Sequence, residues 1–286
     1  MATLKETKAR IASVRSTLKI TSAMKLVASA KLRKAQQAAE NCGAYERELA
    51  SILEAISVAG DSLHAPLLPE DAPQPKVAVV ALSSNSSLCG GFNNNVIKKA
   101  REVVAEIGPD SVELYAIGRE ISDAFAKAGL KSVRDYTELS AHPSYSEAAS
   151  LADELVDGYL SGRFSKVVLV WNHFLSTSSQ KPFVETYLPF ERKEGSGSVE
   201  DLLADYLVEP DLKALYSELL PKTLRLRIYS LLLDSAAAEH AARTVAMQTA
   251  TDNGNEILEE LTLEYNKGRQ AKITAEILDL AGGQQE

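Results

Sequence analysis

Hydrophobic residues at the two ends of the chain recur at intervals of three, four and seven positions, which is the spacing of one face of an α-helix. In residues 1–58, which contain no proline, this pattern predicts one long amphipathic helix. No proline follows Pro221 either, and Pro221 itself stands where a helix can start. Roughly sixty residues at 1.5 Å each predict a second helix of about 90 Å.

We expect these two terminal helices to pair with each other. A helix of that length needs a partner along most of its course, because helical propensity alone does not stabilise it in water. No other long helix is predicted. The seams are imperfect heptads rich in Ala, Ser and Thr, which favours a slender antiparallel coiled coil over a leucine zipper.

The region between the terminal helices alternates between strands and helices. Predicted strands are Val77–Leu82, Val112–Ile117, Lys166–Asn172 and, at an edge, Lys181–Leu188; predicted helices are Asn94–Ile107, Ile121–Ala128 and Tyr145–Leu160. This order predicts a parallel-rich sheet covered by helices on both faces. The fold class is therefore α/β: an antiparallel coiled coil of long N- and C-terminal helices with an inserted Rossmann-like domain. The expected divisions are 1–58 for the N-terminal helix, 59–75 for a proline-rich linker, 76–208 for the inserted domain and 209–286 for the C-terminal helix.

Charge is distributed unevenly along the chain. Of its 286 residues, the first 36 contain nine Lys or Arg and one acid, Glu6, although the whole chain has a net charge of −8. This segment could be a targeting peptide, a nucleic-acid arm, a membrane-surface helix or a helix with a protein partner. No apolar run is long enough to span a membrane, residues 1–30 lack the apolar core of a secretory signal, and the net acidity argues against nucleic-acid binding. Two cysteines, Cys42 and Cys89, form no disulfide or metal pattern, which is typical of a reducing compartment.

The sequence offers no catalytic, cofactor or metal site. The loop SSNSSLCGGFNNN (Ser83–Asn95) follows the first strand, where a Rossmann domain holds phosphate, but it lacks both glycine-rich phosphate motifs. The four histidines fall in separate segments without zinc-ligand spacing. The tetrapeptide WNHF (Trp171–Phe174) ends a strand, yet no partner acid or nucleophile can be identified for it in the sequence.

The C-terminal helix carries an unusual mixture of residues over Ala250–Thr274, ATDNGNEILEELTLEYNKGRQAKIT. Asn and Gly are poor helix formers, and Gln248 and Asp252 interrupt the apolar seam. A merely solvated face would favour Glu and Lys pairs. A polar surface of small residues is typical of a helix that touches several partners weakly.

Three segments together resemble the gamma subunit of F-type ATP synthases. They are ITSAMKLVASAKLRKAQ near the start, LCGGFN after the first strand and EHAARTVAMQTATDNGNEILEELTLEYNKGRQAKITAEI near the end, in the family's order. The resemblance implies that the paired helices form a rotating shaft inside a ring of alternating alpha and beta subunits. It also implies that the inserted domain forms a foot that sits, with the epsilon subunit, on the ring of c subunits.

The resemblance further implies that this subunit performs no chemistry, binds no cofactor, metal or nucleic acid, and couples c-ring rotation, driven by protons or sodium ions, to the beta-subunit sites. It would be peripheral, without membrane insertion, on the cytoplasmic face of a bacterial inner membrane. Two alternatives remain from the residues themselves: a coiled-coil adaptor, and an α/β nucleotide-binding enzyme with helical dimerisation arms.

Individual positions match the family's functional residues. The positions that match the family's contacts with the alpha and beta ring, or its coupling residues, are Met24, Lys25, Arg243, Arg269, Gln270, Thr274 and Glu276. The positions that match the family's foot-domain loop are Leu88, Cys89, Gly90, Gly91 and Phe92. The basic N-terminal segment would face an acidic loop of the beta subunits. The chain departs from the family pattern at Asn85–Ser87, where an Asp–basic–Gly sequence is usual, so a charged contact from this loop is in question.

Overall fold

The computed structural model describes residues 3–59, 75–189, 209 and 211–282. The expected linker 59–75 and the end of the expected 76–208 domain, from residue 190 onward, lie almost entirely outside this part of the chain.

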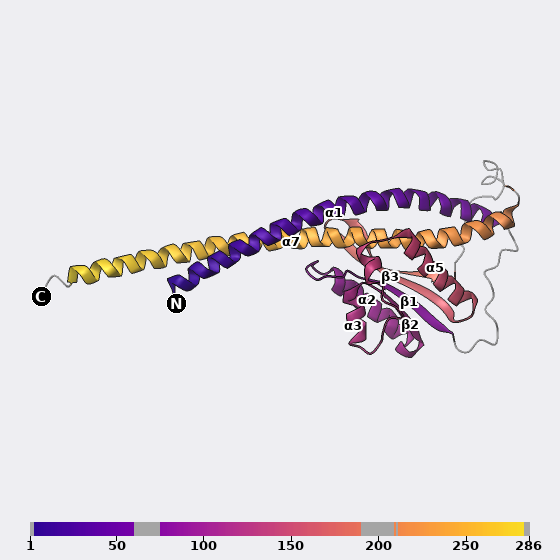
Figure 1. Cartoon of the computed structure of the whole chain (residues 1–286), viewed down its shortest axis with the longest axis horizontal. Coiled ribbons are helices and arrows are strands. Elements are labelled where there is room, and N and C mark those ends of the chain that lie inside the picture. The colour runs from indigo at the N-terminus through magenta and orange to yellow at the C-terminus, as the bar shows by residue number, and fades with distance from the viewer. Residues whose placement is uncertain (1–2, 60–74, 190–208, 210, 283–286) are drawn as a thin grey trace.

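Two long helices dominate the molecule and run antiparallel to each other (Figure 1). Helix α1 spans Leu4–Ala59, with 56 residues, and α7 spans Leu212–Gly282, with 71 residues. At 1.5 Å per residue, α7 is about 105 Å long. Its C-terminal end extends beyond the start of α1 (Figure 1). The predicted antiparallel pair of terminal helices is confirmed.

A capping box begins α1. The Glu6 backbone N–H donates to Thr3 Oγ1 at 3.3 Å, and the Thr3 backbone N–H donates to Glu6 Oε2 at 2.9 Å. These reciprocal bonds satisfy backbone donors that have no partner within the helix. The bonds from Thr3 also lower the pKa of the Glu6 carboxyl.

The C-terminal helix starts before Pro221, the residue at which the sequence suggested that a helix can begin. Helix α7 begins at Leu212, and Pro221 lies inside it. The Asp211 side chain accepts a 2.8 Å bond from the Ala214 backbone N–H, which is an N-cap contact. A proline within a helix removes one backbone bond, but packing of the neighbouring Leu220 against the domain core supports the helix there.

The inserted domain contains one four-stranded sheet. Its strands are β1 (Lys76–Leu82), β2 (Val112–Ile117), β3 (Phe164–Ser176) and β4 (Ser179–Leu188), in the order β2-β1-β3-β4. Strand β1 is parallel to β2 and β3, pairing Val79 with Leu114 and with Val168. Strand β4 is antiparallel to β3 and forms the predicted edge.

Helices cover both faces of the sheet, as predicted. On one face, α2 (Phe92–Ile107) and α3 (Arg119–Ala126) bury apolar side chains against the strands. On the other face lie α5 (Tyr145–Leu160) and the N-terminal half of α7. The short helices η1 (Pro109–Ser111) and α4 (Thr137–Ala141) lie in the connections. Because α7 packs on the sheet and also on α1, it joins the helix pair rigidly to the domain.

Candidate functional site

We call the pair of α1 and α7 the shaft and the domain of β1–β4 with α2–α5 the foot. Polar contacts cross the shaft at successive levels. The hydroxyl groups of Thr21 and Thr251 lie 2.9 Å apart. One turn further along α1, Lys25 Nζ donates to Gln248 Oε1 at 2.5 Å. Gln248 in turn donates to the Asp252 carboxylate at 2.7 and 2.9 Å. These contacts occupy Lys25, a predicted partner-contact residue, within the shaft.

Two glycines of α7 allow close approach of the helices. A Cβ atom placed on Gly254 would lie 2.7 Å from Leu18 Cδ2, and one on Gly268 would lie 3.1 Å from Leu4 Cδ2. The small and polar residues of this segment, which we attributed to contact with other proteins, are thus partly explained by contact between α1 and α7. The remaining polar positions, such as Asn253 and Asn255, are exposed.

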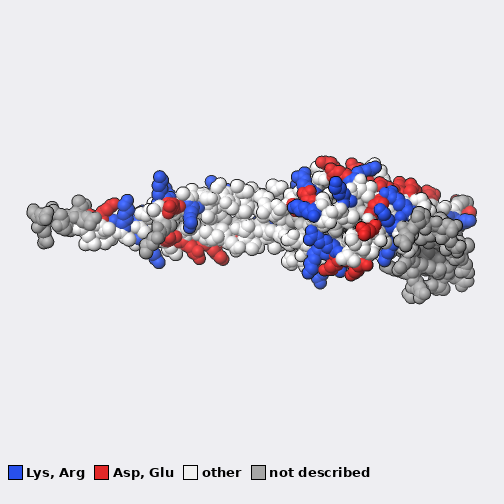
Figure 2. Space-filling view, turned by 90° about the horizontal axis from the view of Figure 1, so that it is seen from below, with Lys and Arg blue, Asp and Glu red and all other residues white. Residues whose placement is uncertain are grey.

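The N-terminal half of α1 presents a basic and apolar surface. Of the nine Lys and Arg residues in this segment, eight are exposed, and none of them forms an ion pair within the described residues. Beside half-buried Met24, the side chains of Ile20, Leu26 and Val27 are 57%, 69% and 57% exposed. Figure 2 shows that the stretch of the shaft next to the foot carries few charged side chains on the face in view, whereas charged side chains of both signs gather nearer the free end. Unpaired cations beside exposed apolar residues are typical of a protein-contact surface.

The predicted contact residues near the end of α7 are all exposed. Arg269, Gln270, Thr274 and Glu276 lie close to or beyond the level at which α1 begins, beside Gly268 and its neighbour Leu4. Their contacts in the structure are local: Thr274 Oγ1 donates to the Gln270 carbonyl at 3.0 Å, and the exposed Glu276 carboxylate lies 3.7 Å from Lys272 Nζ.

Arg243, by contrast, points into the molecule. Its side chain is 12% exposed and donates to the Ser87 carbonyl at 2.6 Å, to Ser86 Oγ at 3.0 Å and to Glu239 Oε1 at 2.8 Å. Arg243 of α7 therefore holds the loop after β1 to the shaft through a neutral hydroxyl and a carbonyl, while Glu239 on the same helix pairs with the guanidinium. The unusual sequence Asn85–Ser87 still supports a contact with a cation.

This loop presents one apolar side chain to solvent. Leu88 adopts a left-handed backbone conformation with φ 65° and is 61% exposed, whereas its neighbour Cys89 is 1% exposed. Burial raises the pKa of the Cys89 thiol, so the thiolate is disfavoured. Phe92, which begins α2, is also buried. Of the predicted foot-loop residues, Leu88 thus has the most accessible side chain.

The WNHF segment has a partner acid that the sequence did not reveal. Asp234 of α7 accepts from Trp171 Nε1 at 2.8 Å and from the Phe174 backbone N–H at 3.0 Å, and its Oδ2 lies 2.7 Å from His173 Nδ1. Nearby on the same helix, Arg227 pairs with Glu185 of β4 and, at 2.8 Å, with Glu46 of α1. Both clusters connect the shaft to the foot, so the role of the WNHF segment is to attach the foot to α7. The residues paired in these clusters lie dozens of positions apart in the sequence, so no local sequence pattern indicates them.

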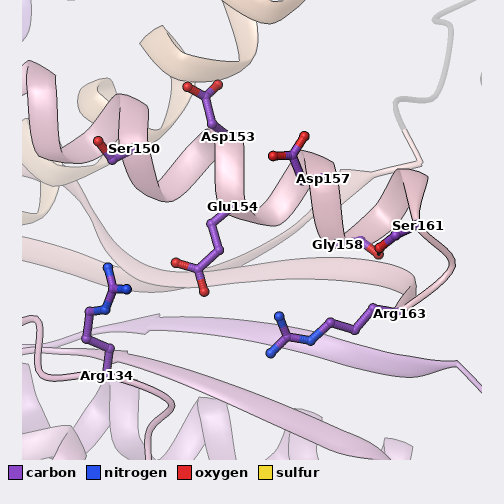
Figure 3. Close-up of a pocket in the computed structure, with 8 residues that line it drawn as sticks. All are labelled: Arg134, Ser150, Asp153, Glu154, Asp157, Gly158, Ser161 and Arg163. Carbon is purple, nitrogen blue, oxygen red and sulfur yellow. The ribbon is translucent and has the colours of Figure 1, made fainter.

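The hollow of about 690 Å³ beneath α5 is a shallow, charged surface (Figure 3). Glu154 points into it between Arg134 and Arg163 (Figure 3). The Tyr115 hydroxyl donates to Glu154 at 3.1 Å, while Arg163 pairs with Glu113. These groups are engaged with each other, and the site is not arranged as an acid, base and nucleophile. Across the residues that the structure describes, no group of three or more potential metal ligands occurs.

Comparison with known proteins agrees with this arrangement. A family model described as ATP synthase matches residues 3–285. The ATP synthase gamma chain of Phocaeicola vulgatus is 47% identical over 287 residues, covering 99% of both chains. That of Bacteroides fragilis is 46% identical with the same coverage, and that of Pelotomaculum thermopropionicum is 38% identical over 283 residues. The chain belongs to the ATP synthase gamma chain family. The family assignment made from the sequence is confirmed.

Solved structures related to this gamma-chain family member share its fold. A chain of the mitochondrial ATP synthase of Euglena gracilis (OSCP, F1 and c-ring) aligns with a TM-score of 0.63 at 17% identity, covering 98% of this chain and 93% of that one. A chain from the central stalk and c-ring of Tetrahymena thermophila aligns with a TM-score of 0.56 at 22% identity, covering 81% and 99%. The long paired helices and inserted sheet are therefore an architecture common to distant relatives.

Proposed function

We propose that this gamma chain is the central rotor stalk of a proton- or sodium-translocating F-type ATP synthase. The observation that carries the proposal is a helix of 71 residues, α7, that packs on the foot at one end and projects from the shaft at the other. In this role the chain carries out no chemical step itself. It transmits rotation from a c ring to the catalytic sites of a surrounding alpha and beta ring.

Transmission of rotation to the alpha and beta ring requires that the sides of the shaft expose different side chains. Helix α1 presents exposed lysines and arginines, whereas the facing stretch of α7 presents Asn253, Asn255 and Glu256. A surface of unequal sides makes different contacts with each subunit it faces, and such differences shift each subunit toward a different conformation. Acidic segments of the beta subunits are the complementary partner for the cations of α1.

The foot supplies the attachment for rotation. Leu224, Ile228 and Leu231 of α7 are 5%, 2% and 2% exposed where the helix packs on the sheet, and Arg227 connects α7 to both β4 and α1. We propose that the foot sits on the c ring together with the epsilon subunit, peripheral to the membrane on its cytoplasmic side. No helix among the described residues is both long and apolar enough to cross a bilayer.

For the individual residues we propose two roles. Met24, Arg269, Gln270, Thr274 and Glu276 contact the alpha and beta ring directly. The last four are exposed, and half-buried Met24 lies beside exposed apolar side chains of α1. Arg243 and Lys25 act instead as positioning residues: Arg243 fixes the loop that carries Leu88, and Lys25 fixes α1 against Gln248 of α7. In the same division of the chain, 59–75 links the shaft to the foot.

Reconstitution tests the proposal. Alpha and beta subunits of a close relative are assembled with this chain, without it, or with a version ending at residue 268, and ATP hydrolysis and rotation of a bead fixed to the foot are recorded. We expect rotation with the full chain, none without it, and impaired coupling between hydrolysis and rotation with the truncated chain. Equal hydrolysis with and without the chain contradicts the rotor role, and saturable ATP binding by the isolated chain favours the enzyme alternative.

A further inference from the structure

His240 lies on the stretch of α7 where the shaft joins the foot. Just before and after it, Ala237 and Ala241 are buried and pack with Leu32 of α1 and Phe174 of β3. An alanine side chain buries little apolar surface, and the free energy gained by burial scales with that area. The contact between α1 and α7 is therefore weaker at this level than a contact between larger apolar side chains would be.

The imidazole of His240 has no acceptor for a second proton. Its Nδ1 is buried and forms no hydrogen bond with any group in the described chain. A neutral imidazole carries a proton on one ring nitrogen, whereas the charged form carries a proton on both. Charging His240 with the chain in this conformation therefore leaves the N–H group at Nδ1 without an acceptor, which costs free energy.

The charges around His240 also oppose a further positive charge. Burial is the main cause that lowers the pKa of His240; of the neighbouring charges, Glu239 raises the pKa, while Lys31 of α1 and Arg243 of α7 lower it. Glu239 is already paired with Arg243 at 2.8 Å, and the loop after β1 offers this arginine only uncharged oxygen atoms. A proton on His240 would therefore add a third cation to a group with one acid.

We propose that protonation of His240 opens the contact between α1 and α7 at this level, so that the shaft separates locally while the foot stays folded. Lys31 and His240 belong to different helices, and their repulsion therefore acts across a contact made by small side chains. The opening itself does not depend on the rotor role. Its consequence for a rotating shaft, a loss of stiffness in acid, rests on the proposed function.

Amide hydrogen exchange of the full chain at pH 7.5 and pH 5.5 measures this opening. At each pH the protection factors are compared with those of His240→Gln, so that the intrinsic pH dependence of exchange cancels. With an ordinary pKa of 6.5 for the histidine in the open form, the opening equilibrium of residues 26–34 should rise by up to about tenfold relative to the variant between the two pH values. Helix α3, which lies in the foot, should show no such difference.

Two further variants identify the cause. Lys31→Gln removes a cation from an exposed position of α1, so His240 can be charged at lower cost in the closed form and the pH effect should shrink. His142→Gln, at an exposed position of the foot, is the matched control and should leave the effect unchanged. The absence of a pH effect in residues 26–34 overturns the proposal. Equal protection of these residues and β1 at both pH values also overturns it, since the two segments would then open only together.

Discussion

Gly254 of α7 leaves the space that Leu18 of α1 occupies: a Cβ at Gly254 would lie 2.7 Å from Leu18 Cδ2. This close approach explains why a residue that costs about 1 kcal/mol of helix stability relative to Ala stands in the middle of a long helix. The two helices meet here at a separation that a larger side chain would not permit.

Gly254→Val should therefore lower the melting temperature of the full chain, followed by circular dichroism, because the branched side chain displaces Leu18. Gly254→Ala should have a smaller effect, since the end of Leu18 can shift and alanine improves helix propensity. Adding Leu18→Ala to Gly254→Val should restore part of the loss. A double variant whose losses simply add would show that the two residues do not interact.

Arg227 should be more important for stability than a surface ion pair. Replacing it with Met leaves Glu46 and Glu185 facing each other without a cation, at carboxylates only 17% and 30% exposed. We expect a loss of about 2 kcal/mol in the free energy of unfolding by urea, below the range for fully buried pairs because the site is partly solvated. The matched control is Lys222→Met, whose pair with Glu218 is largely exposed and should leave stability nearly unchanged. Equal losses in both variants would contradict the role of Arg227.

Asp234→Asn should alter the environment of Trp171, the single tryptophan of the chain. The carboxylate accepts bonds from the indole of Trp171 and the backbone of Phe174 at once, while an amide offers only one acceptor oxygen. We expect a shifted tryptophan emission and a loss of about 1–3 kcal/mol in stability. Asp153→Asn, which breaks the exposed pair with Arg225, should leave the emission unchanged; an unaltered spectrum in Asp234→Asn would refute the contact.

His240 should make stability depend on pH. Burial lowers the pKa of its side chain from the ordinary 6.5, and Lys31 and Arg243 act in the same direction while Glu239 opposes them. Below about pH 6.5 the unfolded chain binds a proton that the folded chain resists, so this contribution to stability is complete above that pH and declines as the pH falls. The fall in melting temperature between pH 7.5 and pH 5.5 should be smaller in His240→Gln. Identical pH profiles would exclude His240 as the source.

Arg243→Ala should release the loop that carries Leu88 while leaving the foot folded. Hydrogen bonds hold the guanidinium to Ser86, Ser87 and Glu239, and the sheet does not depend on them. We expect faster amide hydrogen exchange in residues 86–90 with little change in β1 or β3. Lys at this position should protect the loop only in part, because an ammonium cannot reproduce the fork of the guanidinium. Uniform acceleration across the foot would indicate that the residue supports the whole domain.

The long helices, the alternating foot and the family could be predicted from the sequence, because helix periodicity, buried strand runs and a dense C-terminal motif are all local patterns. The first residue of α7 was not evident from these patterns, since Pro221 is a common first residue of helices while the capping role of Asp211 depends on one side-chain bond. Which polar residues face inward is visible only in the folded chain. Arg243 turns to the loop, Gln248 meets Lys25, and Asp234 meets Trp171. Such pairings depend on the relative register of segments far apart in the chain, and that register is set by the packing of whole helices and strands.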